Sequence, residues 1–215
     1  MTLQLHFHPL SSFSQKVLIA LYENDTPFDP YIVKFGDETS RRDFFELWPL
    51  GKIPVLKDMA RDWMVPETSI IIEYLDQHYP GPTRFIPTDA DLARRMRLRD
   101  RFFDLYVNGP MQKIVTDRLR PEGGHDSFGV DEARRLLSTA LELVDGAMGS
   151  KEWAAGTEFS MADCAAAPAL WYANEVQPFA DKHSNAFAYL KRLMARPSFA
   201  RALREAEPYL AYFPR

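Results

Sequence analysis

The sequence predicts a two-part chain, an α/β domain with the element order βαβαββα followed by an all-helical domain. Up to about residue 80, short runs with period-two alternation take turns with short helical runs, whereas only helical periodicity follows. Between the two parts, residues 80–89 (PGPTRFIPTD) contain three prolines and one glycine, a composition typical of a linker. We therefore expect a first domain over residues 1–80, a linker over 81–89 and a helical domain over 90–215.

Four strands and three helices are expected in the first domain. The strands cover residues 3–7, 28–35, 53–58 and 62–67, and the helices cover 14–24, 39–48 and 67–79. Pro30 cannot donate a ladder hydrogen bond, so the second strand is expected at a sheet edge or with a bulge. Thr39 or Ser40 would cap the second helix. The side chains expected to face inward from the third helix are Ile70, Ile71, Tyr74 and Leu75. This order predicts a mixed sheet rather than a doubly wound one.

The second domain is expected to consist of helices alone. Their ranges are 91–119, 130–148, 160–176, 185–195 and 198–206. The first is long, and we expect it to bend where Gly109 and Pro110 interrupt the pattern. The third is apolar nearly all round, so it is expected to lie in the core.

The composition argues against several classes of function. The 215 residues are 46% hydrophobic, enough to bury a substantial core, and the net charge of -4 gives no field that would attract nucleic acid or an anionic membrane. No apolar run is long enough to span a bilayer, and the N-terminus does not resemble a signal peptide. With Cys164 as the one cysteine, no internal disulfide is expected, and a reducing, cytoplasmic location is favoured. The five histidines form no i, i+4 pair, so no metal site is expected.

The stretch SSFSQKVLIAL places three hydroxyls at the start of a predicted helix. Ser12 and Gln15 have the spacing of a capping box, in which Ser12 accepts a hydrogen bond from a first-turn N–H group. Ser11 would then lie just outside the helix, near the positive end of its dipole. It is either a plain loop residue or a hydrogen-bond donor to an anion bound there.

Two further motifs add polar groups at element ends. In GKIPVL, a cis Ile53–Pro54 bond would leave the backbone of Ile53 free to pair with an extended ligand, although an edge strand that begins at a trans proline also fits. In PETSIIIEYL, Glu67, Thr68 and Ser69 stand at the start of a helix. They suit either helix capping or a zwitterionic ligand group, with its carboxylate on the N–H groups and its ammonium near Glu67.

Taken together, SSFSQKVLIAL, GKIPVL, ETSIIIEYL and FSMADCAAAPAL resemble the cytosolic glutathione S-transferase family over essentially the whole chain. The serine-type classes, and theta- or zeta-like bacterial members among them, look nearest. The resemblance implies a thioredoxin-like first domain, and it makes Ser160 and Asp163 the structural capping box of the family's C-terminal half. It also implies a homodimer and glutathione as the co-substrate, with no metal.

The resemblance implies roles for particular residues. Ser11 would donate a hydrogen bond to the glutathione thiolate, because serine also stands at Ser14 and a dithiol mechanism is excluded. The expected glutathione-binding residues are Ser11, Phe13, Lys52, Ile53, Pro54, Glu67 and Thr68. An apolar electrophile would contact Leu10, Phe103, Tyr106, Val107, Met111, Trp171 and Tyr172, although a place in the core is the interpretation that the sequence favours for such side chains.

Three functions remain open at this point. The first is conjugation of glutathione to apolar electrophiles. The second is isomerisation of the maleylacetoacetate type, because SSFS resembles the zeta-type SSCS, although Phe13 stands where that motif has cysteine. The third is a binding protein that keeps the fold without catalysis.

Overall fold

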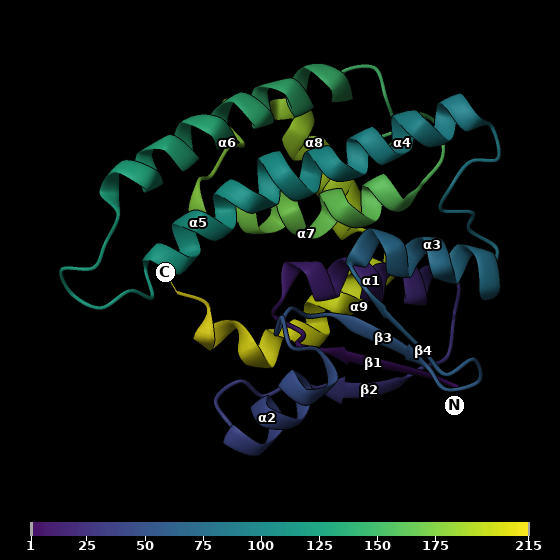
Figure 1. Cartoon of the computed structure of the whole chain (residues 1–215). Helices are drawn as coiled ribbons and strands as arrows, with labels where there is room; N and C mark the ends of the chain where they lie inside the picture. The colour runs from purple at the N-terminus through teal and green to yellow at the C-terminus, as the bar shows by residue number, and fades with distance from the viewer. Residues whose placement is uncertain (1, 215) are drawn as a thin grey trace.

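The computed structural model describes residues 2–214, and its first half has the expected order of elements. These are β1 (Leu3–Phe7), α1 (Ser12–Glu23), β2 (Asp29–Ile32), α2 (Glu38–Leu47), β3 (Val55–Asp58), β4 (Trp63–Pro66) and α3 (Thr68–His78). The strand order is β2-β1-β3-β4, with β1 and β2 parallel and the other pairs antiparallel. The predicted mixed sheet is therefore confirmed, with β2 and its proline at an edge. Helices α1 and α3 cover one face, and α2 lies on the other (Figure 1).

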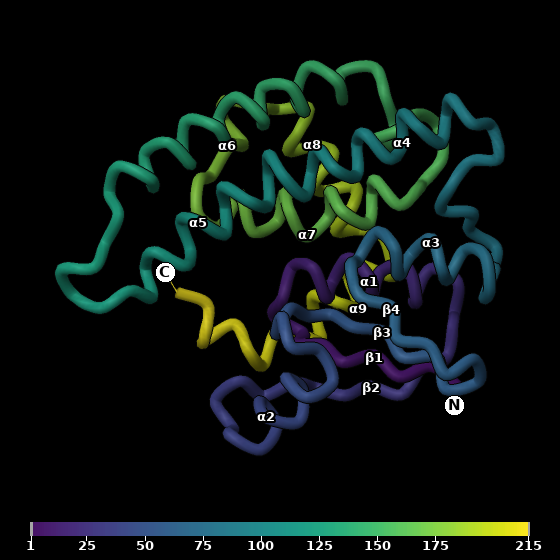
Figure 2. The backbone as a smooth tube through the Cα atoms, viewed as in Figure 1, coloured from purple at the N-terminus to yellow at the C-terminus, as the bar shows by residue number. Residues whose placement is uncertain are grey.

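The second half is helical, as predicted. It contains α4 (Ala90–Phe102), the π-helix η1 (Phe103–Asn108), α5 (Gly109–Asp117), α6 (Ser127–Met148), α7 (Met161–Val176), α8 (Ser184–Met194), α9 (Pro197–Ala206) and the 3₁₀ helix η2 (Glu207–Tyr212). The predicted long helix is thus interrupted by the π-helix immediately before Gly109. No helix among the described residues is long and apolar enough to cross a membrane. Figure 2 shows the backbone between α3 and α4 crossing from one half to the other, and the C-terminal segment returning toward the first half.

Two helix caps differ from the expectation. Ser11, not Ser12, is the N-cap of α1, because the helix already begins at Ser12 and the Ser11 side chain accepts from the N–H of Ser14 at 3.2 Å. Asp37 caps α2 in place of Thr39 or Ser40, and its carboxylate accepts from the N–H of Ser40 at 2.8 Å. Both helices begin earlier than the apolar pattern indicates. The pattern misses the true start because a cap is recognised by its polar side chain and not by apolar spacing.

The inward face of α3 is shifted from the prediction, with Ile72 buried in place of Ile70. Ile71, Tyr74 and Leu75 are buried, but Ile70 is 54% exposed. Three consecutive isoleucines span too wide an arc of a 3.6-residue helix to face one side, and Ile71 and Ile72 are the two that lie in the core.

One continuous core joins the two halves. Helix α1 packs against α3 in its own half and against α7 and α9 in the helical half. The apolar helix α7 is buried along most of its length, as expected. Its N-terminal capping box is present, with Asp163 accepting from the backbone N–H of Ser160 at 2.9 Å, and the buried Tyr189 hydroxyl also donates to Asp163 at 2.6 Å.

Candidate functional site

A pocket of about 480 Å³ collects all seven residues that the sequence motifs single out for glutathione. They come from the start of α1, the loop before β3 and the start of α3. Side chains that the sequence did not single out complete the wall, and these are Phe35, Trp48, Arg101, Asp104, Leu105 and Gln112, together with Gly51. The lining thus combines polar and charged groups with aromatic and aliphatic ones, as in a site for an amphipathic small molecule.

Ser11 occupies the loop between β1 and α1, with an extended backbone and its N–H bonded to the carbonyl of His8 at 3.0 Å. As the helix cap, its hydroxyl oxygen accepts from Ser14, so its own O–H remains able to donate into the pocket. The first-turn N–H groups of α1 add a positive partial charge beside it. Ser12 is buried and does not line the pocket, so Ser11 is the residue with a hydroxyl that lines it at the start of α1.

The second motif forms a tight turn into β3. The Ile53–Pro54 peptide bond is cis. Gly51 has a φ of +63°, and a Cβ placed there would lie 2.5 Å from the Phe45 ring, so the turn accepts glycine alone without rearrangement. Because β3 begins at Val55, the backbone of Ile53 lies outside the strand ladder and beside the pocket.

The third motif places acidic and hydroxyl groups at the start of α3. Glu67 precedes the helix with a φ of +68° and makes no side-chain cap hydrogen bond, while Thr68 opens the helix. Across the pocket, Arg101 and Asp104 approach from the helical half. The site is therefore assembled from both halves, with carboxylates and N–H groups at one end, an arrangement suited to an amino-acid-like group.

Behind the pocket, a buried ion cluster joins the two halves. The Lys16 Nζ lies 2.7 Å from Asp100 Oδ1 and 2.8 Å from Asp104 Oδ2. The Lys16 Nζ also donates to the Ser69 hydroxyl at 3.0 Å, and that hydroxyl donates to Asp100 at 2.6 Å. Burial raises the pKa of Asp104, while the nearby Lys16 acts in the opposite direction. Asp104 thus shares its carboxylate between the pocket wall and this cluster.

The apolar residues predicted for a second substrate are not brought together. Phe103, Val107 and Met111 are buried in the core, Tyr106 is 47% exposed, and none of them lines the pocket. Leu10 and Trp171 are half-buried against the core, and Tyr172 is buried, with its hydroxyl bonded to the carbonyl of Leu10. Asp104 and Leu105, both in the π-helix, line the pocket instead. The one sequence signal for a polar pocket wall here was Asp104, an acidic residue in the otherwise apolar run FFDLY.

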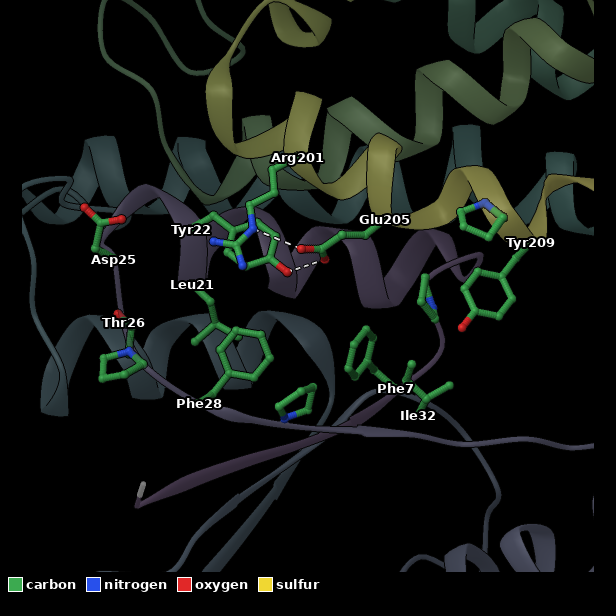
Figure 3. A pocket seen from close by; sticks show the side chains of 14 residues that line it. Phe7, Leu21, Tyr22, Asp25, Thr26, Phe28, Ile32, Arg201, Glu205 and Tyr209 are labelled. Carbon is green, nitrogen blue, oxygen red and sulfur yellow. Dashed lines mark hydrogen bonds and ion pairs between the residues drawn. The ribbon is translucent and has the colours of Figure 1, made fainter.

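A second cavity, of about 560 Å³, lies between α1, the β2 edge and α9 (Figure 3). Its polar groups satisfy one another: Glu205 accepts from the Tyr22 hydroxyl and from the Arg201 side chain, and the guanidinium stacks over the Tyr22 ring at 3.9 Å. Burial and Glu205 raise the pKa of Tyr22, so this phenol stays protonated. This cavity carries no helix N-terminus and no serine, and we place the candidate active site at the pocket that contains Ser11. Among residues 2–214, no group of three His, Cys, Asp or Glu side chains is arranged to hold a metal.

Comparisons with known proteins agree on one family. Residues 5–83 match the model "Glutathione S-transferase, N-terminal domain", and residues 114–197 match "Glutathione S-transferase, C-terminal domain". The chain is 31% identical to FtsZ-localized protein A of Caulobacter vibrioides, over 96% of this chain and 93% of that protein. It is 24% identical to glutathione S-transferase GstB of Escherichia coli, over 86% and 89%. A glutathione S-transferase of Methylobacillus flagellatus, solved with GSH bound, is 25% identical with a TM-score of 0.83, over 93% of this chain and 98% of that one.

Proposed function

The chain belongs to the glutathione S-transferase family, and on that premise we propose that it activates the thiol of glutathione as a thiolate for conjugation to apolar electrophiles. The observation that carries the proposal is Ser11, a helix cap whose O–H remains free to donate into the pocket. In the proposal, residues 1–80 bind glutathione, and residues 90–215, beyond the linker 81–89, complete the electrophile side.

The energy available at Ser11 supports the thiolate. Lowering the pKa of the glutathione thiol by two units requires about 2.7 kcal/mol. A charge-assisted hydrogen bond supplies roughly 1.5–3 kcal/mol, and a helix N-terminus up to about 2 kcal/mol. The sum is sufficient without a general base, which a neutral serine hydroxyl could not be.

The other motifs suit the charged ends of glutathione. The backbone of Ile53, beside the cis Pro54, would pair with the cysteinyl unit as a strand does. Glu67 would face the γ-glutamyl ammonium, and the N-terminus of α3 at Thr68 would face the γ-glutamyl carboxylate. Lys52 would reach the glycyl carboxylate, and Phe13 would pack beside the tripeptide. On the helical side, Leu105 would contact the electrophile, with Leu10 at its edge.

The test is the ultraviolet thiolate absorbance of glutathione bound to the purified protein at about pH 6.5, where free glutathione is roughly 1% ionised. We expect a large thiolate signal, together with conjugation of an activated aryl halide. Turnover of a cis-dienone diacid without conjugation would instead support the isomerase. Saturable glutathione binding without thiolate would refute the proposed activation.

The identity of one relative favours a second candidate function. FtsZ-localized protein A carries a name that refers to a location and not to a reaction, and it matches nearly the full chain. A member of this family that binds partners without turnover would retain the fold and the core. The thiolate measurement separates the two candidates, because a binding protein has no need to ionise glutathione.

We also expect a homodimer in the cytoplasm, where reduced glutathione is abundant. Large apolar side chains remain exposed on elements of both halves, and these include Trp63, Ile70, Leu98 and Tyr106. Light scattering should give twice the 24.8 kDa chain mass. Leu98→Glu, at a position 67% exposed, should shift the mass toward that of one chain if this surface forms the contact. A monomeric mass for the unmodified protein would contradict the expectation.

A further inference from the structure

Tyr172 reaches from α7 in the helical half to the loop that carries Ser11. Its hydroxyl donates to the carbonyl oxygen of Leu10 at 2.6 Å. From the opposite side, the Gln15 amide donates to the carbonyl of Pro9 at 2.9 Å and to the Tyr172 hydroxyl at 3.3 Å. The residues that hold the loop, Tyr172 and Gln15, are buried. The two peptide groups directly before Ser11 are therefore fixed by side chains of two different elements.

The ring of Tyr172 is itself braced by the C-terminal segment. Measured between centroids, the Phe213 ring lies 5.3 Å from the Tyr172 ring, and the ring of Trp171 lies 4.6 Å from it. The carbonyl of Pro214 accepts from the Arg118 guanidinium at 2.9 Å, which ties the segment down. Burial raises the pKa of Tyr172, so the phenol remains a donor at any physiological pH. The hydrogen bond to Leu10 thus has a fixed direction.

The arrangement has a cost that stability alone does not explain. Within residues 2–214, the buried Gln15 Oε1 has no hydrogen-bond partner, and an unsatisfied buried carbonyl costs about 1–3 kcal/mol. An apolar side chain of similar size at Gln15 would avoid that cost. A glutamine at this position is therefore better explained by its hydrogen bond to the Pro9 carbonyl, which fixes the loop, than by stability.

We propose that Tyr172 is a positioning residue, which together with Gln15 fixes the Pro9–Leu10–Ser11 backbone so that the Ser11 hydroxyl points at the glutathione thiol. The inference rests on the proposed function of Ser11. A hydrogen bond weakens steeply as its angle departs from linear, so a small rotation of this loop lowers thiolate stabilisation without removing any group that touches glutathione.

The test compares Tyr172→Phe with Tyr189→Phe. Tyr189 is also buried and also loses a 2.6 Å hydrogen bond, to Asp163, but it does not contact the loop. In Tyr172→Phe, we expect kcat and the bound thiolate fraction at pH 6.5 to fall about threefold to tenfold, the size of one misaligned hydrogen bond, with a smaller change in the KM for glutathione. Tyr189→Phe should lose stability without this change.

A second readout separates this inference from the proposed function. Amide hydrogen exchange at residues 10–14 should be faster in Tyr172→Phe than in Tyr189→Phe or the unmodified protein. If the unmodified protein forms no thiolate, the proposed function fails. Amide hydrogen exchange at residues 10–14 then still tests whether Tyr172 holds the loop. Unchanged thiolate and unchanged exchange in Tyr172→Phe would overturn the inference. If Tyr172→Phe does not fold, Gln15→Met serves as the test variant, and the same results support or overturn the inference.

Discussion

Ser11→Ala is expected to lower turnover about 10- to 100-fold at pH 6.5 while the affinity for glutathione changes little. The substitution removes the hydroxyl that would donate to the thiolate, and a hydrogen bond to a charged group is worth about 1.5–3 kcal/mol. The groups proposed to bind the rest of the tripeptide, at Ile53, Glu67 and Thr68, remain in place. Initial-rate kinetics and calorimetric titration with glutathione measure the two effects separately.

The pH dependence gives the same variant a sharper signature. Without its donor, the thiolate is less favoured, so the pKa of the bound thiol should rise toward the free value of roughly 8.5. The rate ratio between unmodified protein and variant should then be large at pH 6.5 and shrink as the pH rises above that value. An equal rate ratio at pH 6.5 and above the pKa of the free thiol would mean that Ser11 acts on something other than thiol ionisation.

A matched control is needed because Ser11 also caps α1. Loss of a helix cap costs about 1 kcal/mol of stability. Asp89 caps α4 away from the pocket by accepting from the N–H groups of Asp91 and Leu92, so Asp89→Ala should lose similar stability and keep full activity. Ser11→Thr, which keeps a hydroxyl, should recover part of the rate. Normal turnover in Ser11→Ala would remove the role proposed for this residue.

That the three motifs would meet in one pocket was predictable because their information is local. Each of its three motifs sits at the end of one element, where special residues such as Gly51, Pro54 and a capping serine leave a clear mark in the sequence. Antiparallel pairing of β1 with β3, and of β3 with β4, then brings the end of β1, the start of β3 and the end of β4 to the same end of the sheet. The topology was itself implied by the alternation of short strands and helices.

The wall that the helical half contributes to the pocket was not predictable from periodicity. A regular helix over 91–119 would present Phe103, Val107 and Met111 as one stripe, and a stripe gives no sign of whether it faces a core or a ligand. The π-helix η1 then changes the register locally, which sequence spacing does not reveal. Tyr172 illustrates the same limit, because its role depends on the polar tip reaching a loop 162 residues earlier in the chain.

The cluster around Lys16 leads to the second large prediction. Lys16 and its partners Asp100 and Asp104 are buried, and they come from α1, α4 and η1, so the ion pairs bridge the two halves of the fold. One ammonium faces two carboxylates. Removing it therefore leaves both acids without a cation in the low-dielectric interior, apart from the more exposed Arg101 beside Asp104.

Lys16→Met, which keeps the length of the side chain, is expected to lower the free energy of unfolding at pH 7 by about 3–5 kcal/mol. The loss should shrink on acidification. The pKa of Asp104 is already raised by burial, and removing Lys16 raises it further. A carboxyl whose folded pKa lies above its unfolded value contributes stability that is fully present below the unfolded pKa, near 3.9, and is lost as the pH rises through the folded pKa. The stability of the variant should therefore approach that of the unmodified protein as the pH falls from 7 to 4, as followed by urea unfolding at each pH.

The control is Lys113→Met, which breaks the partly exposed pair with Asp126 and should cost at most about 1 kcal/mol. A small, pH-independent loss in Lys16→Met would show that the two carboxylates are solvated or protonated in the native protein and that the cluster does not hold the halves together.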